Sequence, residues 1–360
     1  CAAVYTTSHF QAAPIIVTKD SIAKEGKIQA VIVNSACANA CTGERGLADA
    51  YKMRSLTSNA FNIAEHHIAV ASTGVIGEYL QMDKIANGIG SIKIGKELNK
   101  AEEFQTAILT TDTVMKSSCY TGEIDGKTVY MGGAAKGSGM IHPNMATMLG
   151  FLTTDANISP ENLNCALKEI TDVTFNQITV DGDTSTNDMV IVLANGEAGN
   201  EPLTPEHSEW QTFVQLLKAN CESLAKQIAR DGEGATKLVE VEVLGALSDD
   251  EARAVAKQIV GSNLVKTAIY GADANWGRII GAVGQAEVFV NPNKVDVKLG
   301  GLEMLKASTP LVYSEEEAKS YLEKDTIVIT VNLNVGEGTG KAWGCDLSYD
   351  YVKINASYRT

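Results

Sequence analysis

The segment HHIAVASTGV, residues 66–75, decides the expected fold class, because it joins a continuous apolar run to a Ser-Thr-Gly turn. The segment KIQAVIVNS (27–35) has the same character. Apolar runs of this length are typical of strands that are covered on both faces. The residues between them, RGLADAYKMRSLTSNAFNI (45–63), show the apolar spacing of a helix. This alternation predicts α/β layering, with loops at the strand ends that are available for chemistry.

The rest of the chain continues the alternation and ends in a part rich in hairpins. We expect a helix, a strand, a polar loop and a strand over 159–195, then a long amphipathic helix from a Thr-Pro start at 204 to Gly232. The last part is expected to contain one strand, one helix and two hairpins, over 236–246, 248–271, 287–301 and 326–355. The sequence therefore predicts a layered α/β sandwich, with a smaller C-terminal α+β portion that begins at about residue 240.

Composition limits the class of protein. With 360 residues the chain can form two domains, or one large α/β domain with a satellite. The net charge of −14, without a Lys/Arg-rich run, argues against nucleic acid as a partner. The seven cysteines are scattered and form no CxxC pair, which indicates reduced thiols in a cytoplasmic protein rather than a zinc site or a disulfide framework.

The ends and the apolar runs of the chain are also informative. No apolar run approaches the roughly 18 residues of a membrane span, so no membrane is expected. The start, CAAVYTTSHFQAAP (1–14), lacks the features of a signal peptide. It also lacks an initiator methionine, and we therefore expect that an N-terminal segment precedes it.

The segment KGSGMIHPNMATMLGFLTTDA (136–156) places a threonine behind a small alanine in apolar surroundings. If the Ala146–Thr147 bond were cleaved, Thr147 would gain a free α-amine with a pKa of about 8, which suits a general base near neutral pH. Threonine with its own N-terminal amine is an established nucleophile–base pair. On the residues alone, a buried apolar strand after a loop is the favoured alternative, because Ala-Thr pairs are common.

Six segments, one of which lies within the segment just described, occur in order along the chain. They are STGVIG (72–77), TTDT (110–113), KGSGMIHPNMATML (136–149), TVDGDTSTND (179–188), DGEGATK (231–237) and WGCDLSYDYVKINASYRT (343–360). Together they closely resemble the glutamate N-acetyltransferase (ornithine acetyltransferase) family of arginine biosynthesis. The segment VNSACANACTG (33–43) fits too, although many members have Gly-Asn where this chain has Ala36-Cys37. The resemblance covers the whole chain.

The resemblance implies that the chain cleaves itself between Ala146 and Thr147, giving pieces 1–146 and 147–360. Thr147 would then be the nucleophile that carries the acetyl group. Thr73 and Gly74 of STGVIG would form the oxyanion hole, where a hydroxyl and a backbone N–H converge on one oxygen. Without the resemblance, this motif is more simply a strand-to-helix turn or a phosphate-binding nest.

The resemblance also implies the substrate-binding residues. Amino-acid substrates are zwitterionic, so a pocket needs a cation for the carboxylate and an anion for the side-chain ammonium of ornithine. The family pattern assigns substrate binding to Thr113, Lys136, Thr147, Glu233, Asn355 and Thr360. Within TTDT it favours Thr113 over Thr111. The C-terminal YDYVKINASY (349–358) has a strand-like pattern, which is compatible with a docked C-terminus.

The implied reaction moves acetyl from N2-acetylornithine to glutamate in a ping-pong scheme that needs no metal and no cofactor. Acetyl-CoA is a second possible donor, but the sequence offers no recognisable site for its phosphates. Two copies of each piece would form a heterotetramer. Two alternatives stay open. One is an N-terminal-nucleophile amidase or aminopeptidase that passes the acyl group to water, and the other is an uncleaved homologue without catalysis.

Three other groups of residues are assigned no chemistry. Asp181, Asp183 and Asp188 in DGDTSTND lack the spacing of a calcium loop, so we expect a polar loop near the active site. The histidines 66, 67 and 142 are interpreted as structural. The segment GADANWGRIIGAVG (271–284) lacks GxGxxG and is expected to be a packing turn.

Overall fold

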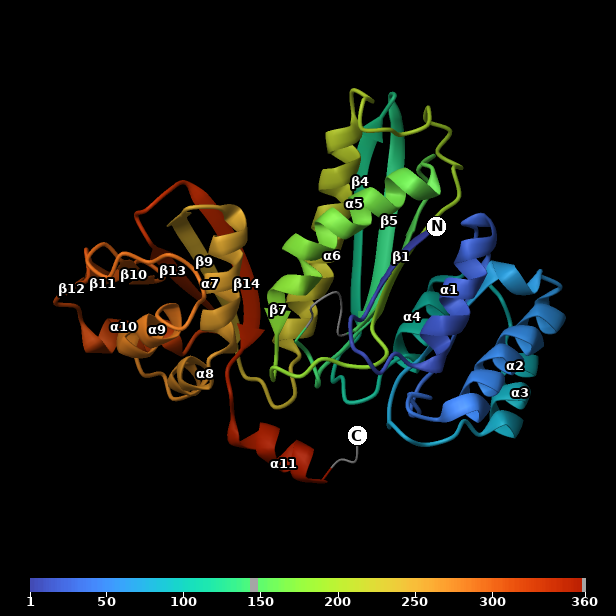
Figure 1. Cartoon of the computed structure of the whole chain (residues 1–360), viewed down its shortest axis with the longest axis horizontal. Coiled ribbons are helices and arrows are strands. Elements are labelled where there is room, and N and C mark those ends of the chain that lie inside the picture. The colour runs from blue at the N-terminus through green and yellow to red at the C-terminus, as the bar shows by residue number, and fades with distance from the viewer. Residues whose placement is uncertain (143–147, 358–360) are drawn as a thin grey trace.

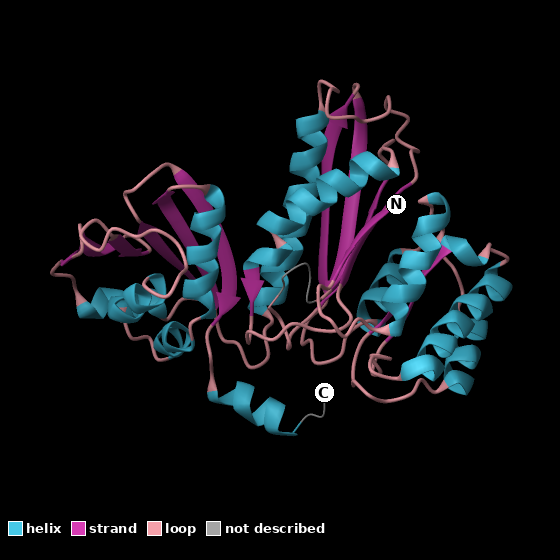
Figure 2. Cartoon of the chain, viewed as in Figure 1, coloured by secondary structure: helices cyan, strands magenta, loops and turns pink. Residues whose placement is uncertain are grey.

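The computed structural model describes residues 1–142 and 148–357. These residues form three β-sheets with helices on their outer faces (Figures 1 and 2). The central sheet has the strand order β1-β8-β6-β5-β4. Its strands are β1 (Ala2–Tyr5), β8 (Met189–Ala194), β6 (Leu149–Thr154), β5 (Lys127–Lys136) and β4 (Lys116–Ile124). The predicted cleavage point lies between β5 and β6, which are antiparallel neighbours in this sheet.

A small parallel sheet covers one face of the central sheet. It consists of β2 (Ala30–Asn34) and β3 (Ile68–Ser72), and a 3-10 turn, η1 (Glu65–His67), leads into β3. Four helices follow or flank these strands on the side shown at the right of Figure 1. They are α1 (Ala13–Glu25), α2 (Gly43–Phe61), α3 (Met82–Ser91) and α4 (Leu98–Ala107).

The other face of the central sheet is covered by α5 (Pro160–Val173) and α6 (Trp210–Arg230), with a 3-10 turn, η2 (Phe175–Gln177), after α5. Alternate residues of β8 face opposite cores. Val190 and Val192 pack with the two helices, whereas Met189 and Ile191 pack with β3. Both faces of the strand are therefore buried, which explains its continuous apolar run.

Helices α1 and α2 pack on the outer face of the small sheet. The successive layers are thus helices, the β2–β3 sheet, the central sheet, and α5 with α6. The predicted layered α/β sandwich is confirmed by this arrangement.

The C-terminal part forms a mixed seven-stranded sheet of order β12-β11-β10-β13-β9-β14-β7. Its strands are β12 (Thr309–Pro310), β11 (Leu302–Lys306), β10 (Asp296–Leu299), β13 (Thr326–Asn332), β9 (Leu238–Ala246), β14 (Gly338–Cys345) and β7 (Ile178–Thr179). Four helices accompany it: α7 (Asp249–Gly261), α8 (Asn263–Tyr270), α9 (Trp276–Val283) and α10 (Glu315–Leu322). Trp343 and Cys345 of β14 join the core around α6, so this helix links the two large sheets.

The predicted hairpin over 326–355 is wrong. Strand β9 lies between β13 and β14, parallel to the first and antiparallel to the second. The connecting loop passes so close to β9 that a Cβ at Gly336 would lie 2.2 Å from the backbone oxygen of Ala246. The local turn residues indicate that the chain bends here, but they do not show which strand it then joins. The other predicted hairpin, over 287–301, is present, but its two strands are β10 and β11. Residues 287–295 contain no strand.

The predicted strand at the C-terminus is also wrong, because residues Tyr349–Ser357 form helix α11. The hydroxyl oxygen of Ser348 accepts from the backbone N–H groups of Asp350 (3.1 Å) and Tyr351 (3.4 Å) at the start of this helix. None of its described residues is buried. An alternating pattern forms a strand only where a sheet edge pairs with it, and here a side-chain cap favours a helix instead.

Two helices and one turn differ from the prediction. The expected helix over 248–271 is divided at Ser262, whose hydroxyl caps α8. The long helix begins at Trp210, because turns close between Thr204 and His207 and between His207 and Trp210. The expected packing turn over 271–284 contains the helix α9, although its residues do pack into the C-terminal core.

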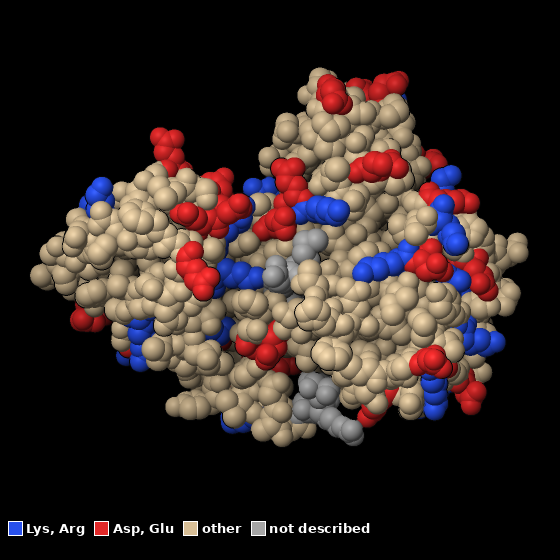
Figure 3. All heavy atoms as spheres, in the orientation of Figure 1, with Lys and Arg blue, Asp and Glu red and all other residues tan. Residues whose placement is uncertain are grey.

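No helix among the described residues is long and apolar enough to cross a membrane. On the face drawn in Figure 3, acidic and basic side chains are interspersed without a basic patch.

Candidate active site

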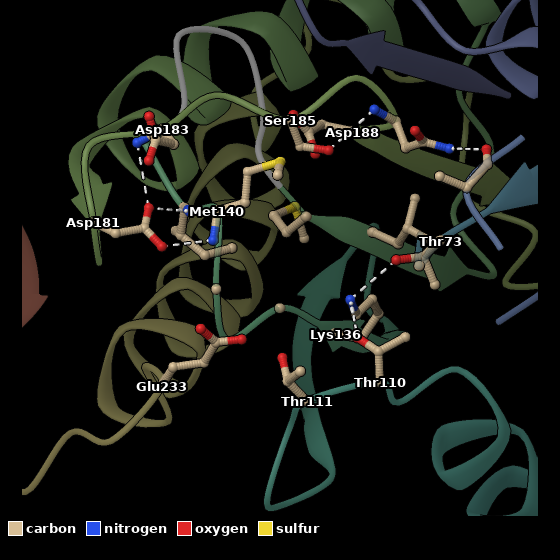
Figure 4. Close-up of a pocket in the computed structure, with 18 of the residues that line it drawn as sticks. Thr73, Thr110, Thr111, Lys136, Met140, Asp181, Asp183, Ser185, Asp188 and Glu233 are labelled. Atoms are coloured by element: carbon tan, nitrogen blue, oxygen red, sulfur yellow. Dashed lines mark hydrogen bonds between the residues drawn. The ribbon is translucent and has the colours of Figure 1, made fainter. Parts of the chain in front are cut away.

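Loops gather at one end of the central strands (Figure 2). A cavity of about 180 Å³ lies among these loops (Figure 4). It is bounded by the segments that follow β3 and β5, those that precede β4, β6 and β8, and residues from the α6–β9 loop and α11. These segments are far apart in sequence. The strands bring them together because β3 and β5 end where β6 and β8 begin.

Thr73 and Gly74 follow β3 directly and line the cavity. Gly74 has φ +130°, and a Cβ there would lie 2.2 Å from the carbonyl carbon of Ala36. The backbone of Val75 donates to Ala36 O (3.2 Å), so the turn is held against this loop. Among the described residues, no acceptor contacts the Gly74 N–H. The turn can therefore direct a hydroxyl and a backbone N–H at one bound oxygen, although no helix follows it directly.

Lys136 is the last residue of β5, and its side chain is nearly buried. The ammonium donates to the hydroxyl oxygens of Thr73 (3.1 Å) and Thr110 (2.9 Å), as Figure 4 shows. Burial lowers the pKa of the Lys136 ammonium, and the carboxylate of Asp112, 3.9 Å from Nζ, opposes that shift.

Glu233 and Asn355 meet on the opposite side of the cavity. The side-chain amide of Asn355 donates to Glu233 Oε2 at 2.8 Å. The backbone N–H of Glu233 donates to Ser138 O at 3.0 Å, which fixes its position beside the segment after β5. Gly139 leaves room for the Glu233 carboxylate, because a Cβ there would lie 2.4 Å from it. The cavity thus presents a cation on one wall and an anion on another.

The acidic loop before β8 lines the cavity, in agreement with the predicted polar loop near the active site. Asp181 accepts from the backbone N–H groups of Met140 (2.6 Å) and Ile141 (2.9 Å), and burial nevertheless raises its pKa. Burial also raises the pKa of Asp188 well above its usual value. These contacts tie the loop to the residues that precede the predicted cleavage point.

Thr113 does not line this cavity. Its hydroxyl donates to Asp231 Oδ1 and its backbone N–H to Asp231 Oδ2 (3.0 Å). Thr110 and Thr111 of the same motif line the cavity instead. The motif was predicted to contribute to the site, but the threonines that face the cavity were not identified, and Asp112 behind them was missed. The TTDT segment carried the signal, but only the loop conformation decides which side chains point inward.

Ala146, Thr147 and Thr360 lie outside the described residues. Met148, whose nitrogen is bonded to the carbonyl carbon of Thr147, lines the cavity at the start of β6. Its backbone oxygen accepts from Met189 N at 3.0 Å, which places the start of β6 beside the start of β8.

Two groups of described side chains have the spacing of metal ligands, and neither lines the cavity. One is Glu25 with the histidines 66 and 67, and the other is Asp125 with His207 and Glu209. His142 lies near the cavity loops with Nδ1 2.9 Å from the Thr179 hydroxyl, and burial lowers its pKa to about 4.

Comparison with known proteins gives the family. The ArgJ family model matches residues 1–360. The chain belongs to the ArgJ family. This confirms the resemblance inferred from the sequence segments.

Relatives within the ArgJ family are close in sequence. The chain is 68% identical over 359 residues to the arginine biosynthesis bifunctional protein ArgJ of Geobacillus kaustophilus, covering 100% of this chain and 88% of that protein. It is 64% identical over 360 residues to the protein of the same name from Halalkalibacterium halodurans, with the same coverage. A crystal structure of arginine biosynthesis bifunctional protein argJ from Bacillus halodurans has 65% sequence identity and a TM-score of 0.58, and covers 59% of this chain and 100% of that chain.

Proposed function

We propose that this ArgJ-family chain, an acetyltransferase of arginine biosynthesis, moves acetyl from N2-acetylornithine to glutamate through an ester on Thr147. The observation that carries the proposal is the cavity at the start of β6. Oxyanion donors, a cation and an anion line this cavity together with Met148, the residue bonded to Thr147. The single cavity therefore contains groups for both acyl chemistry and amino-acid recognition.

Self-cleavage comes first in this proposal. The hydroxyl oxygen of Thr147 attacks the carbonyl carbon of Ala146, the peptide C–N bond breaks, and the nitrogen takes a proton to become the free α-amine. Water then hydrolyses the resulting ester. Residues 147–360 would be about three-fifths of the chain, and the solved B. halodurans chain covers a similar share, 59%. This agreement in size supports the cleavage.

Acetyl transfer uses the same hydroxyl with the new α-amine as its base. The hydroxyl oxygen attacks the acetyl carbonyl of N2-acetylornithine, Thr73 and Gly74 stabilise the oxyanion, and ornithine leaves with the proton. The amine of glutamate then attacks the acetyl ester and returns the proton to Thr147. Apolar residues such as Met148 and Leu149 beside the nucleophile limit the access of water to the ester.

Substrate recognition is assigned by charge. The ammonium of Lys136 contacts the substrate carboxylate, and Glu233, oriented by Asn355, contacts the δ-ammonium of ornithine. The roles of Thr113 and Thr360 stay predictions of the family pattern.

The remaining parts of the proposal concern donors, assembly and location. The relatives are named bifunctional, and we include acetyl-CoA as a second acetyl donor. The reaction is proposed to need no metal or other cofactor. We propose that the two pieces remain associated as a heterotetramer, with two copies of each, in the cytoplasm.

The test combines mass and activity. Intact mass and N-terminal sequencing of the purified protein are expected to reveal a piece that begins at Thr147. Incubation with N2-acetylornithine and glutamate is expected to give N-acetylglutamate and ornithine in equal amounts. Thr147→Ala should abolish both results, whereas Thr153→Ala, an exposed threonine on β6, should leave both unchanged.

Three outcomes would contradict the proposal. A stable full-length chain without activity would favour an uncleaved homologue. Release of acetate to water instead of transfer to glutamate would favour an amidase. Undiminished acetyl exchange in Thr147→Ala would exclude the acetyl-threonine intermediate.

A further inference from the structure

A cluster of buried charged side chains lies directly behind Lys136. Its centre is Lys116, the first residue of β4, whose side chain is fully buried. Lys116 Nζ donates to Asp112 Oδ1 (2.7 Å), Asp231 Oδ2 (2.6 Å) and Val114 O (3.3 Å). An ammonium has three N–H groups, so all of them are used inside the protein. Lys116 therefore serves the two carboxylates rather than a bound ligand.

Asp112 lies between Lys116 and Lys136. Its Oδ1 accepts from Lys116 and from the backbone N–H of Gly137 (2.6 Å), and its Oδ2 accepts from the backbone N–H of Thr110 (3.1 Å). Lys136 Nζ lies 3.9 Å from Oδ2, which is beyond hydrogen-bond distance. Burial alone would raise the pKa of Asp112, but Lys136, Lys116 and Gly137 N–H together hold it below its usual value. Asp112 thus balances the charge of Lys136 without accepting one of its N–H groups.

The N–H groups of Lys136 do not bond to Asp112, and two of them donate to hydroxyl oxygens instead. Each hydroxyl, on Thr73 and on Thr110, has one hydrogen, and an ammonium cannot accept it. Among the described residues, neither hydroxyl donates to a protein acceptor, and both threonines line the cavity. The two hydroxyl hydrogens are therefore available to a bound molecule, and donation by the ammonium strengthens them as donors.

We propose that Lys136, held by the buried cluster Asp112–Lys116–Asp231, is a positioning residue of the oxyanion hole. Its ammonium donates a hydrogen bond to the oxygen of the Thr73 hydroxyl, so that the hydrogen of that hydroxyl points toward the developing oxyanion. This inference rests on the proposed function, which assigns Thr73 to the oxyanion hole. It leaves one N–H of Lys136 for a substrate carboxylate, so recognition and oxyanion stabilisation share one side chain.

Buried ion pairs often contribute little net stability, so a purely structural cluster is the simpler alternative. The geometry argues against it in one respect. A cluster that served stability alone would place Lys136 in contact with Asp112. Instead, three other donors satisfy Asp112, and Lys136 is directed at the hydroxyls.

The first test is a double-mutant cycle on acetyl transfer. Lys136→Met and Thr73→Val are measured singly and together, with rates expressed per mole of processed chain from intact mass. We expect Lys136→Met to lower kcat by about 10²-fold, the typical cost of a misplaced catalytic group. In the Thr73→Val background the same substitution should change kcat little. Equal losses of kcat in both backgrounds would overturn the inference, because Lys136 would then act on the substrate independently of Thr73.

The second test separates positioning from stability and keeps Thr73 and Lys136 in place. Lys116→Met leaves an uncompensated buried carboxylate, whereas Lys116→Met with Asp231→Asn removes one charge of each sign. We expect the double variant to unfold near the urea midpoint of the wild type, yet with reduced kcat, because Asp112 then binds Lys136. Recovery of kcat together with stability would overturn the role of Lys116.

Lys298→Met, which removes a half-exposed lysine paired with Glu303 in the C-terminal sheet, is the matched control and should change neither quantity. The two proposals fail separately. A wild type that makes no N-acetylglutamate refutes the proposed function, whereas independent effects in an active wild type refute only this inference.

Discussion

Gly74→Ala tests whether the turn after β3 is held in place by steric contact. The added Cβ would lie 2.2 Å from the carbonyl carbon and 2.5 Å from the oxygen of Ala36, both backbone atoms that cannot rotate away. A left-handed conformation costs an alanine about 1–2 kcal/mol. Overpacking costs about 1–3 kcal/mol more. We therefore expect Gly74→Ala to lower the free energy of unfolding by about 2–5 kcal/mol.

Gly77→Ala in the same turn is the matched control. Gly77 has φ +82°, but a Cβ there would meet no atom within 4 Å. Gly77→Ala should therefore lower the free energy of unfolding only by the cost of the left-handed conformation, about 1–2 kcal/mol. The difference between the two variants isolates the contact with Ala36.

Urea unfolding and acetyl-transfer kinetics together check this prediction. Displacement of the Gly74 N–H by about 1 Å is expected to lower kcat about 10²-fold, whereas Gly77→Ala should retain kcat near the wild-type value. Equal losses of stability in the two variants would refute the steric argument. A Gly74→Ala variant with wild-type kcat would refute the placement of its N–H in the oxyanion hole.

Three further predictions concern the same region. Ala36 has φ +74°. Ala36→Gly relieves about 1–2 kcal/mol of backbone strain, while the greater conformational entropy of the unfolded chain costs about 0.4–1 kcal/mol. Urea unfolding should therefore reveal a small gain in the free energy of unfolding, and a loss would contradict this. The Cβ added by Gly139→Ala pushes the flexible carboxylate of Glu233 away. The KM for N2-acetylornithine should therefore rise, with little change in the free energy of unfolding. An unchanged KM would exclude Glu233 from substrate binding. His142 has a folded pKa of about 4, below the ordinary 6.5. Between these values only the unfolded chain takes up the proton, so stability should fall as pH drops from 6.5 to 4, and His142→Gln should flatten that slope in urea titrations at several pH values.

The backbone conformation of Ala36 explains why the family pattern has glycine at this position. The family pattern described in the sequence analysis has glycine at position 36, and the structure places Ala36 at positive φ. A glycine adopts that conformation without steric cost, so its use there needs no catalytic explanation. The same loop donates and accepts the backbone hydrogen bonds that hold Thr73 and Val75. The loop therefore supports the site without supplying a reacting group.

The site was predictable where a motif lies at the end of a strand. Thr73 follows β3, a strand whose apolar run is visible in the sequence, and the family pattern also identified it. No strand was predicted before Lys136, which the family pattern alone identified. Thr110 was missed, because four residues of TTDT offer three hydroxyls and a carboxylate without an indication of which points inward. Lys116 was missed because a lysine in sequence is expected to be solvated, and only a fold that buries it beside two carboxylates changes that expectation.

The sequence by itself determined part of the secondary structure and the family. Apolar periodicity is a local property, and it predicted β2, β3 and the helix α2 between them, while the ordered motifs identified the ArgJ family. Tertiary structure alone decided that β9 separates β13 from β14, that the C-terminal segment is a helix, and that Lys116 is buried between two carboxylates. The reason is physical. Strand pairing and burial join residues that are many positions apart, and their free energy depends on partners that no local window contains.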